Sequence, residues 1–132
     1  MTDLGRREEI RVPGMAEPIS HYTDAVVAGD TLYISGIVPV DADGNVVGED
    51  VAAQARQVFA IMERVLAAAG ATAADVAKVT VYLLDIDHRP LINPVRQEFF
   101  GEVRPASTLV EVSRLAVPGA LLEIEAVAAI PD

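Results

Sequence analysis

The chain has 132 residues, and its twenty acidic and ten basic side chains give a formal net charge of −10 at pH 7. This charge argues against a nucleic-acid partner, because contacts with the phosphate backbone rest largely on a surface of lysine and arginine. The absence of cysteine excludes disulfides and thiolate chemistry and fits a cytoplasmic protein, and no apolar run reaches the roughly 18 residues of a membrane-spanning helix.

The length predicts one domain over residues 1–132, and its polar start, residues 1–8, is expected to be flexible. An alternating segment around Ile10 predicts a short first strand. Residues 25–28 and 31–35 predict a β-hairpin, because the Gly-Asp pair between them has the composition of a two-residue turn.

The clearest helix follows Asp50 and extends to about Ala69. Its apolar residues recur at alternating four- and three-residue steps, so they lie on one face of the helix. Gly70 then stands at the position where helices commonly end. The methionine and phenylalanine of this stripe are therefore expected in the core.

A strong strand and a shorter helix are predicted next. One face of the strand, residues 76–84, is expected to be fully apolar. The members of that face are Ala77, Val79, Val81 and Leu83. The helix is expected at about residues 91–100, and Pro90 and Pro94 leave its start open. One alternative is a helix whose first residue is Pro94, with Asn93 as its cap.

Two alternating runs, residues 108–115 and 121–128, close the chain, and the Pro-Gly turn between them predicts a second hairpin. In the second run Glu123 and Glu125 alternate with residues apolar enough for a core, so both carboxylates share one face. This pair indicates either an edge strand with a solvated face or a functional site, and Glu111 on the first run adds a third carboxylate.

These elements predict an α+β fold in the order β-β-β-α-β-α-β-β, a mixed sheet with two helices. Two helices cover only one face of a sheet this wide. Since the strands carry apolar residues on both faces, we expect the second face to pack on other copies of the chain. The sequence contains no Gly-rich phosphate loop, nucleophile elbow or metal-ligand cluster.

Several motifs follow one another in a recognisable order. They are SHYTDAV (20–26), ISGIVPV (34–40), VAAQARQVF (51–59), KVTVYLLDI (78–86), Asn93 with Glu98-Phe99-Phe100, and the closing RPASTLVEVSRL and LEIEAVA. In this order they resemble the RidA (YjgF) family of small trimeric enamine/imine deaminases. The resemblance implies a chorismate-mutase-like fold, with six strands and two helices on one face, in which three subunits close a barrel with clefts between neighbours.

By this resemblance the chain would hydrolyse enamines or imines to oxo compounds and ammonia without a cofactor or metal. Glu123 and Tyr22 take the catalytic positions, and Glu123 positions or activates the attacking water. The substrate-binding positions fall on Ser35, Gly36, Asn93, Ser107 and Leu109. A partly desolvated glutamate suits this role, because burial raises its pKa towards the neutral range.

Ser107 departs from the family pattern. The family's deaminases of amino-acid-derived imines carry an arginine there, and a serine hydroxyl does not replace its two-donor clamp on a carboxylate. Arg104 lies three residues upstream, and nothing in the sequence shows that it reaches the cleft.

Two hypotheses follow. The chain is an enamine/imine deaminase of the 2-iminobutanoate/2-iminopropanoate type with altered substrate preference, or it is a non-catalytic homotrimer that binds small metabolites in the same cleft. In both, the partner is a small enamine, imine or carboxylate, and neither involves nucleic acid or a membrane.

Overall fold

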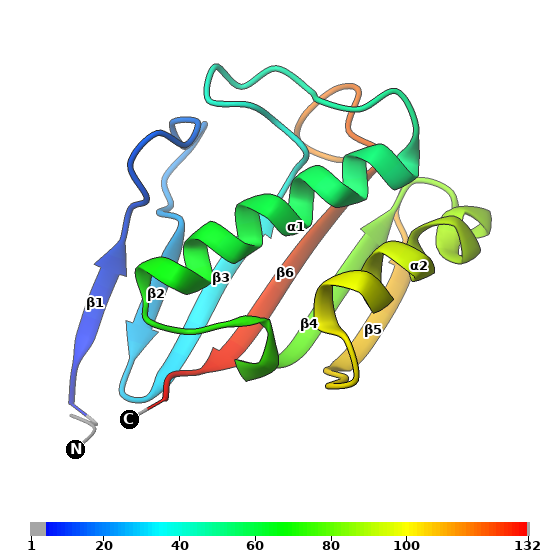
Figure 1. Ribbon diagram of the computed structural model, residues 1–132. Coiled ribbons are helices and arrows are strands. Elements are labelled where there is room, and N and C mark those ends of the chain that lie inside the picture. Colours follow the sequence, from blue (N-terminus) through cyan, green and yellow to red (C-terminus); the bar gives the residue numbers. More distant parts are fainter. Residues whose placement is uncertain (1–4, 132) are drawn as a thin grey trace.

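Alternating apolar residues build six strands that form one mixed sheet in the computed structural model, which describes residues 5–131 (Figure 1). The strands are β1 (Arg7–Ile10), β2 (Ala25–Ala28), β3 (Thr31–Ile37), β4 (Val76–Leu83), β5 (Ala106–Glu111) and β6 (Leu122–Ala129). The predicted class and order of elements are confirmed. Of the segment 1–8 that we expected to be flexible, residues 1–4 lie outside the described residues, and Arg7 and Glu8 belong to β1.

Two helices, α1 (Val51–Ala68) and α2 (Arg89–Phe100), lie on one face of the sheet (Figure 1). Two short 3-10 turns, η1 (Ala73–Asp75) and η2 (Ile86–His88), precede β4 and α2. The predicted start of α1 is confirmed, because the Asp50 carboxylate accepts a hydrogen bond from the Ala53 N–H at 2.8 Å. Within residues 5–131, no helix has the length and apolar character needed to cross a membrane.

The alternative start of α2, with Asn93 as the cap and Pro94 as the first residue, is wrong. The helix begins at Arg89, and Asn93 lies inside it instead of capping it. Pro90 falls in the first turn, where a backbone N–H has no intrahelical partner and proline is well tolerated. The helix therefore starts before Pro90 and continues through Pro94.

The predicted closing hairpin is also wrong, because β5 and β6 are not neighbours. β6 lies between β3 and β4 and runs antiparallel to both, whereas β5 pairs in parallel with β4 at the edge of the sheet. Helix α2 returns the chain after β4, and such a crossover makes the next strand parallel. The Pro-Gly turn is present, with Gly119 at φ 91°, but it belongs to a long connection between β5 and β6.

The helix-covered face of the sheet forms the core. On β6 the residues Leu122, Ile124, Ala126 and Ala128 are at most 3% exposed. On β4 the predicted apolar face needs one correction, because an irregularity between Val76 and Lys78 buries Val76 and leaves Ala77 exposed. A bulge of this kind shifts the alternation by one residue.

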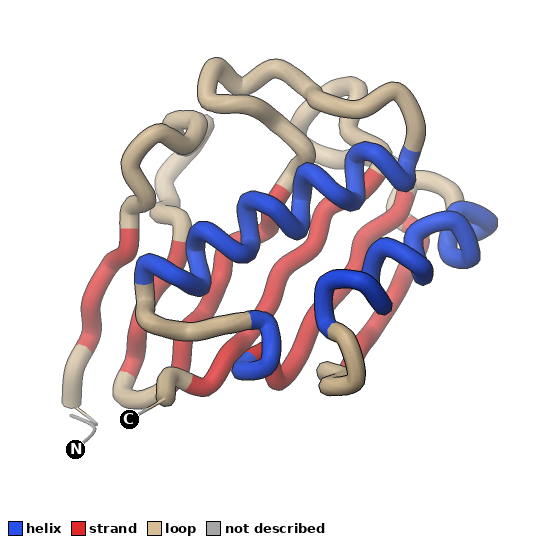
Figure 2. The backbone as a smooth tube through the Cα atoms, viewed as in Figure 1, coloured by secondary structure: helices blue, strands red, loops and turns tan. Residues whose placement is uncertain are grey.

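The opposite face of the sheet carries no covering helix or strand among the described residues. On this face Tyr33 of β3 is 52% exposed and Val110 of β5 is 38% exposed. Long loops gather at one end of the sheet, between β1 and β2, between β3 and α1, and between β5 and β6 (Figure 2). The fold thus presents an open sheet face and a loop-rich end.

Candidate functional site

Glu123 lies on the central strand β6, beside a bulge in β3. The register between these strands shifts between Ile34 and Ile37, which brings Gly36 against the Glu123 side chain. A Cβ atom at Gly36 would lie 2.8 Å from the carboxyl carbon of Glu123 and closer still to one of its oxygens. Only glycine therefore leaves room for this carboxylate.

Because β6 has a partner on each side, the Glu123–Glu125 pair does not belong to an edge strand, and that alternative is wrong. Both side chains are partly buried and point away from the helices. Glu111 does not join them. It lies on β5, and its carboxylate accepts the Ile86 N–H at 3.0 Å.

The two central carboxylates have different surroundings. Glu125 accepts a hydrogen bond from the Tyr82 hydroxyl, and this bond raises the pKa of Tyr82. Glu123 has no hydrogen-bond or ion-pair partner within the described part of the chain. Burial raises the pKa of Glu123, and the charge of Glu125 raises it further. Glu123 is thus a half-buried carboxylate free to exchange a proton.

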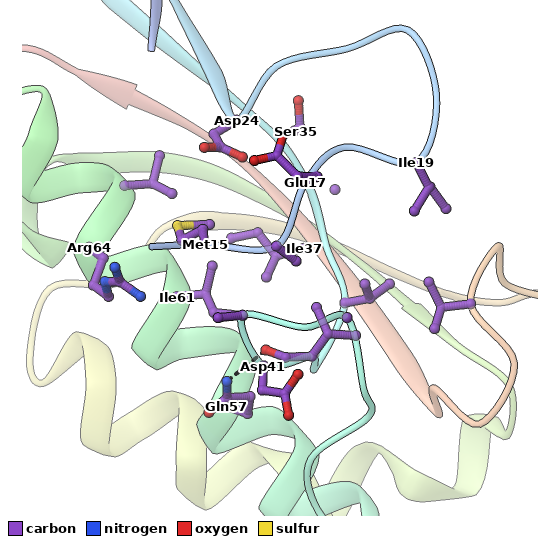
Figure 3. A pocket seen from close by; sticks show the side chains of 18 of the residues that line it. Met15, Glu17, Ile19, Asp24, Ser35, Ile37, Asp41, Gln57, Ile61 and Arg64 are labelled. Atoms are coloured by element: carbon purple, nitrogen blue, oxygen red, sulfur yellow. Dashed lines mark hydrogen bonds between the residues drawn. The ribbon is translucent and has the colours of Figure 1, made fainter. Parts of the chain in front are cut away.

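Tyr22, Ser35 and Gly36 line one pocket of about 140 Å³ at the loop-rich end of the sheet. Figure 3 shows Ser35 in this pocket, with Ile61 and Gln57 of α1. Its walls come from the loops after β1 and β3 and from the side of α1 around Ile61. The Ser35 hydroxyl donates to the Thr23 carbonyl at 2.6 Å, and the exposed Tyr22 hydroxyl accepts the Ile19 N–H at 3.3 Å. The pocket does not include Glu123, which contacts Gly36 from the sheet.

An ion pair that the sequence analysis missed holds the loop between β1 and β2, which carries Tyr22. The Arg11 guanidinium donates to the Asp24 carboxylate at 2.7 Å and to the carbonyls of Met15 and Ala16 at 3.0 and 2.9 Å. The hydrogen bond to Asp24 raises the pKa of Arg11. No sequence motif reveals this contact, because the partners are thirteen residues apart and meet only through the loop.

Asn93, Ser107 and Leu109 lie in a second place, at the β5 edge. Ser107 and Leu109 pair with buried residues of β4, so they belong to the helix-covered face of the sheet. The Ser107 hydroxyl accepts a hydrogen bond at 2.8 Å from the guanidinium of Arg96, which lies one turn after Asn93 on α2. The sequence analysis missed Arg96, because the contact depends on how α2 docks beside β5.

A single chain therefore does not bring all the expected site residues together. The group of Glu123 and Gly36 is separated by β4 from the group at the β5 edge, and Glu123 points to the opposite face from Ser107. Arg104 is exposed and has no hydrogen bond or ion pair within residues 5–131. Over the same residues, no cluster of three or more histidine, cysteine, aspartate or glutamate side chains is arranged to hold a metal.

The chain matches known proteins over almost its whole length. Residues 14–130 match the family described as "Endoribonuclease L-PSP". The chain is 40% identical over 123 residues to the 3-aminoacrylate deaminase RutC of Acinetobacter baylyi, covering 92% of this chain and 97% of the relative. It is 37% identical over 113 residues to the 2-iminobutanoate/2-iminopropanoate deaminase of Salmonella typhimurium, covering 83% and 88%.

Solved structures with the same fold also include members of this group of proteins. The crystal structure of E. coli TdcF with bound serine superposes with a TM-score of 0.85 at 32% identity, covering 92% of this chain and 98% of that one. The expected six-stranded fold with two helices is confirmed by such neighbours. The chain belongs to the Endoribonuclease L-PSP family, the family of RidA, YjgF and RutC, whose members include enamine and imine deaminases.

Proposed function

We propose that this chain is a cofactor-independent enamine/imine deaminase that releases an oxo compound and ammonia, with a substrate preference set by the departure at Ser107. The observation that carries the proposal is the Glu123 carboxylate, half-buried against Gly36 and without a protein partner in the described chain. The relatives named as deaminases of 3-aminoacrylate and of 2-iminobutanoate support the same chemistry.

The reaction needs one group that handles protons. Water adds to the carbon of the C=N bond and loses a proton to Glu123, which passes that proton to the nitrogen, so a carbinolamine forms. Glu123 then takes the proton of the carbinolamine hydroxyl as the C=O bond forms and gives it to the nitrogen as the C–N bond breaks, so one water is consumed and one ammonia leaves. A raised pKa suits both steps, because the group must accept and give a proton near neutral pH.

We infer that the complete site forms between copies of the chain, in a homotrimer. The Glu123 and Gly36 side of one subunit would face the Asn93, Ser107 and Leu109 edge of its neighbour. Two observations support this arrangement: the two groups lie apart within one chain, and the sheet face that carries Glu123 is uncovered and partly apolar.

The second hypothesis, a trimer that binds small metabolites without catalysis, is favoured by one observation, the serine at the arginine position. An RNA substrate is disfavoured by the net charge of −10. The partner we propose in either case is a small molecule.

The test is ammonia and 2-oxo acid release from imines formed in situ by an amino-acid oxidase, compared with the spontaneous rate. We expect acceleration by the wild type, its loss in Glu123→Gln, and an unchanged oligomer by light scattering. Glu63→Gln, the same change on the exposed side of α1, is the matched control. Failure of the wild type to accelerate hydrolysis over small and large amino acids would favour the binding protein instead.

A further inference from the structure

Arg96 is a half-buried cation without an anionic partner. Burial lowers the pKa of its guanidinium, because removing the charge from water costs free energy. Within residues 5–131, Arg96 forms no ion pair, whereas Arg11 is paired with Asp24 and Glu17. An anion bound beside Arg96 would offset this desolvation.

The position of Arg96 is fixed from two sides. On one side, Phe99 of α2 stacks on Phe59 of α1 with ring centroids 4.7 Å apart, and Phe100 meets Phe59 edge to face at 5.6 Å, which sets the rotation of the helix. On the other side, one guanidinium nitrogen donates to the Ser107 hydroxyl at 2.8 Å. The guanidinium has five N–H donors, and this bond uses one of them.

The groups around Arg96 fit a small organic anion. Asn93 lies one helical turn earlier on the same side of α2 and is exposed, so its amide adds a donor. Leu109 lies two residues after Ser107 on the same face of β5 and provides an apolar neighbour. Glu111 shares that face but lies four residues, about 13 Å, from Ser107 and accepts the Ile86 N–H.

We propose that Arg96, oriented by Ser107, binds the carboxylate of the substrate in place of an arginine at position 107, and so selects imines that carry a carboxylate. The proposal deepens the proposed function and rests on it. The planar guanidinium matches a carboxylate through two parallel N–H donors. The serine at position 107 therefore accompanies an arginine supplied by α2 instead of marking the loss of carboxylate recognition.

The kinetic test compares two imines that differ in charge. One is a 2-imino acid made by an amino-acid oxidase, and the other is an uncharged imine made from an alkylamine by an amine oxidase. Arg96→Gln is expected to lower kcat/KM for the 2-imino acid by about 10- to 100-fold and to leave the uncharged imine almost unaffected. Arg89→Gln, the same charge change at the exposed first residue of α2, should leave both rates unchanged.

Two further variants sharpen the result. Arg104→Gln tests the rival arginine and is expected to behave like the control. Ser107→Arg in the Arg96→Gln background is expected to restore part of the lost activity on the 2-imino acid alone. Equal losses on both imines, or no loss on either, would overturn the assignment of Arg96.

Binding separates failure of this inference from failure of the proposed function. Calorimetry is run with 2-oxobutanoate and with butanone, which lacks the carboxylate. If the wild type binds 2-oxobutanoate through Arg96 but hydrolyses no imine, the inference survives and the deaminase proposal fails. If Arg96→Gln binds 2-oxobutanoate as tightly as the wild type, the inference is wrong whatever the turnover. Ser107→Ala, on an exposed strand residue, gives a second variant should Arg96→Gln unfold, with a smaller loss expected in the same direction.

Discussion

The contact between Gly36 and Glu123 gives the sharpest mutational test of the candidate site. Replacing Gly36 with alanine would place a methyl carbon 2.8 Å from the carboxyl carbon of Glu123 and 3.2 Å from its Cγ. Carbon atoms in good contact lie about 3.5–4.0 Å apart, so the glutamate must move by about 1 Å. Because Glu123 is half-buried and its far end is flexible, the carboxylate turns away instead of breaking the strand.

The expected consequence separates stability from activity. Overpacking of this size costs about 1–2 kcal/mol, which lowers Tm by about 4–8 °C. A displacement of a reacting group by about 1 Å lowers the rate about 100-fold, so kcat for imine hydrolysis should fall strongly while the protein stays folded. The assay is imine hydrolysis beside thermal unfolding of the same preparation.

A second glycine provides the control for stability. Gly70 ends α1 at φ 76°, and a Cβ atom there would meet nothing within 4 Å. Gly70→Ala strains the backbone by about 1 kcal/mol without touching the site, so it should lose stability and keep activity. The reasoning is refuted if Gly36→Ala keeps kcat within about threefold of wild type. Restored stability in the Gly36→Ala/Glu123→Ala double variant would trace the cost to this one contact.

Two predictions concern charge. Since the folded pKa of Glu123 is raised, the folded state binds more protons than the unfolded state, and stability falls as pH rises above the ordinary value of 4.5. Glu123→Gln should therefore be more stable than wild type at neutral pH, with a gap that closes towards pH 4 in urea titrations; a constant gap would argue against a raised pKa. Arg11→Met leaves the carboxylate of Asp24, which is 9% exposed, without its cationic partner. This change should lower the free energy of unfolding, measured by urea titration, by about 2 kcal/mol. Arg7→Met, whose ion pair is 65% and 62% exposed, should cost about 0.5 kcal/mol or less, and equal costs would contradict the structural role of Arg11.

Local patterns in the sequence predict the elements well, because short-range physics governs them. Residues only a few positions apart determine the apolar stripe of α1 and its Asp50 cap. The same is true of the tight turn at Gly29 between β2 and β3. The sheet order is different. A Pro-Gly turn between two alternating runs is compatible with a hairpin and with a longer connection between distant strands. Which of the two forms depends on where in the sheet the crossover through α2 places β5.

The same division holds for the candidate site. Gly36 and Glu123 are expected from motifs on their own strands, and the structure explains the pairing by the bulge that brings them together. Arg96 was not expected, because its partner Ser107 is reached only after α2 packs on α1. A contact that depends on how a helix docks, such as that of Arg96 with Ser107, leaves no recognisable sequence motif around either residue. The contact between Gly36 and Glu123 joins neighbouring strands, and each strand has its own motif.

The central position of β6 also constrains how the molecule forms during synthesis. Within residues 5–131 every other strand precedes β6, yet β6 alone pairs with both β3 and β4. Until residues 122–129 have left the ribosome, the sheet exists as two unjoined parts with open edges facing each other. The closing step pairs residues far apart in sequence, which slows folding. Folding of the whole sheet therefore waits for β6.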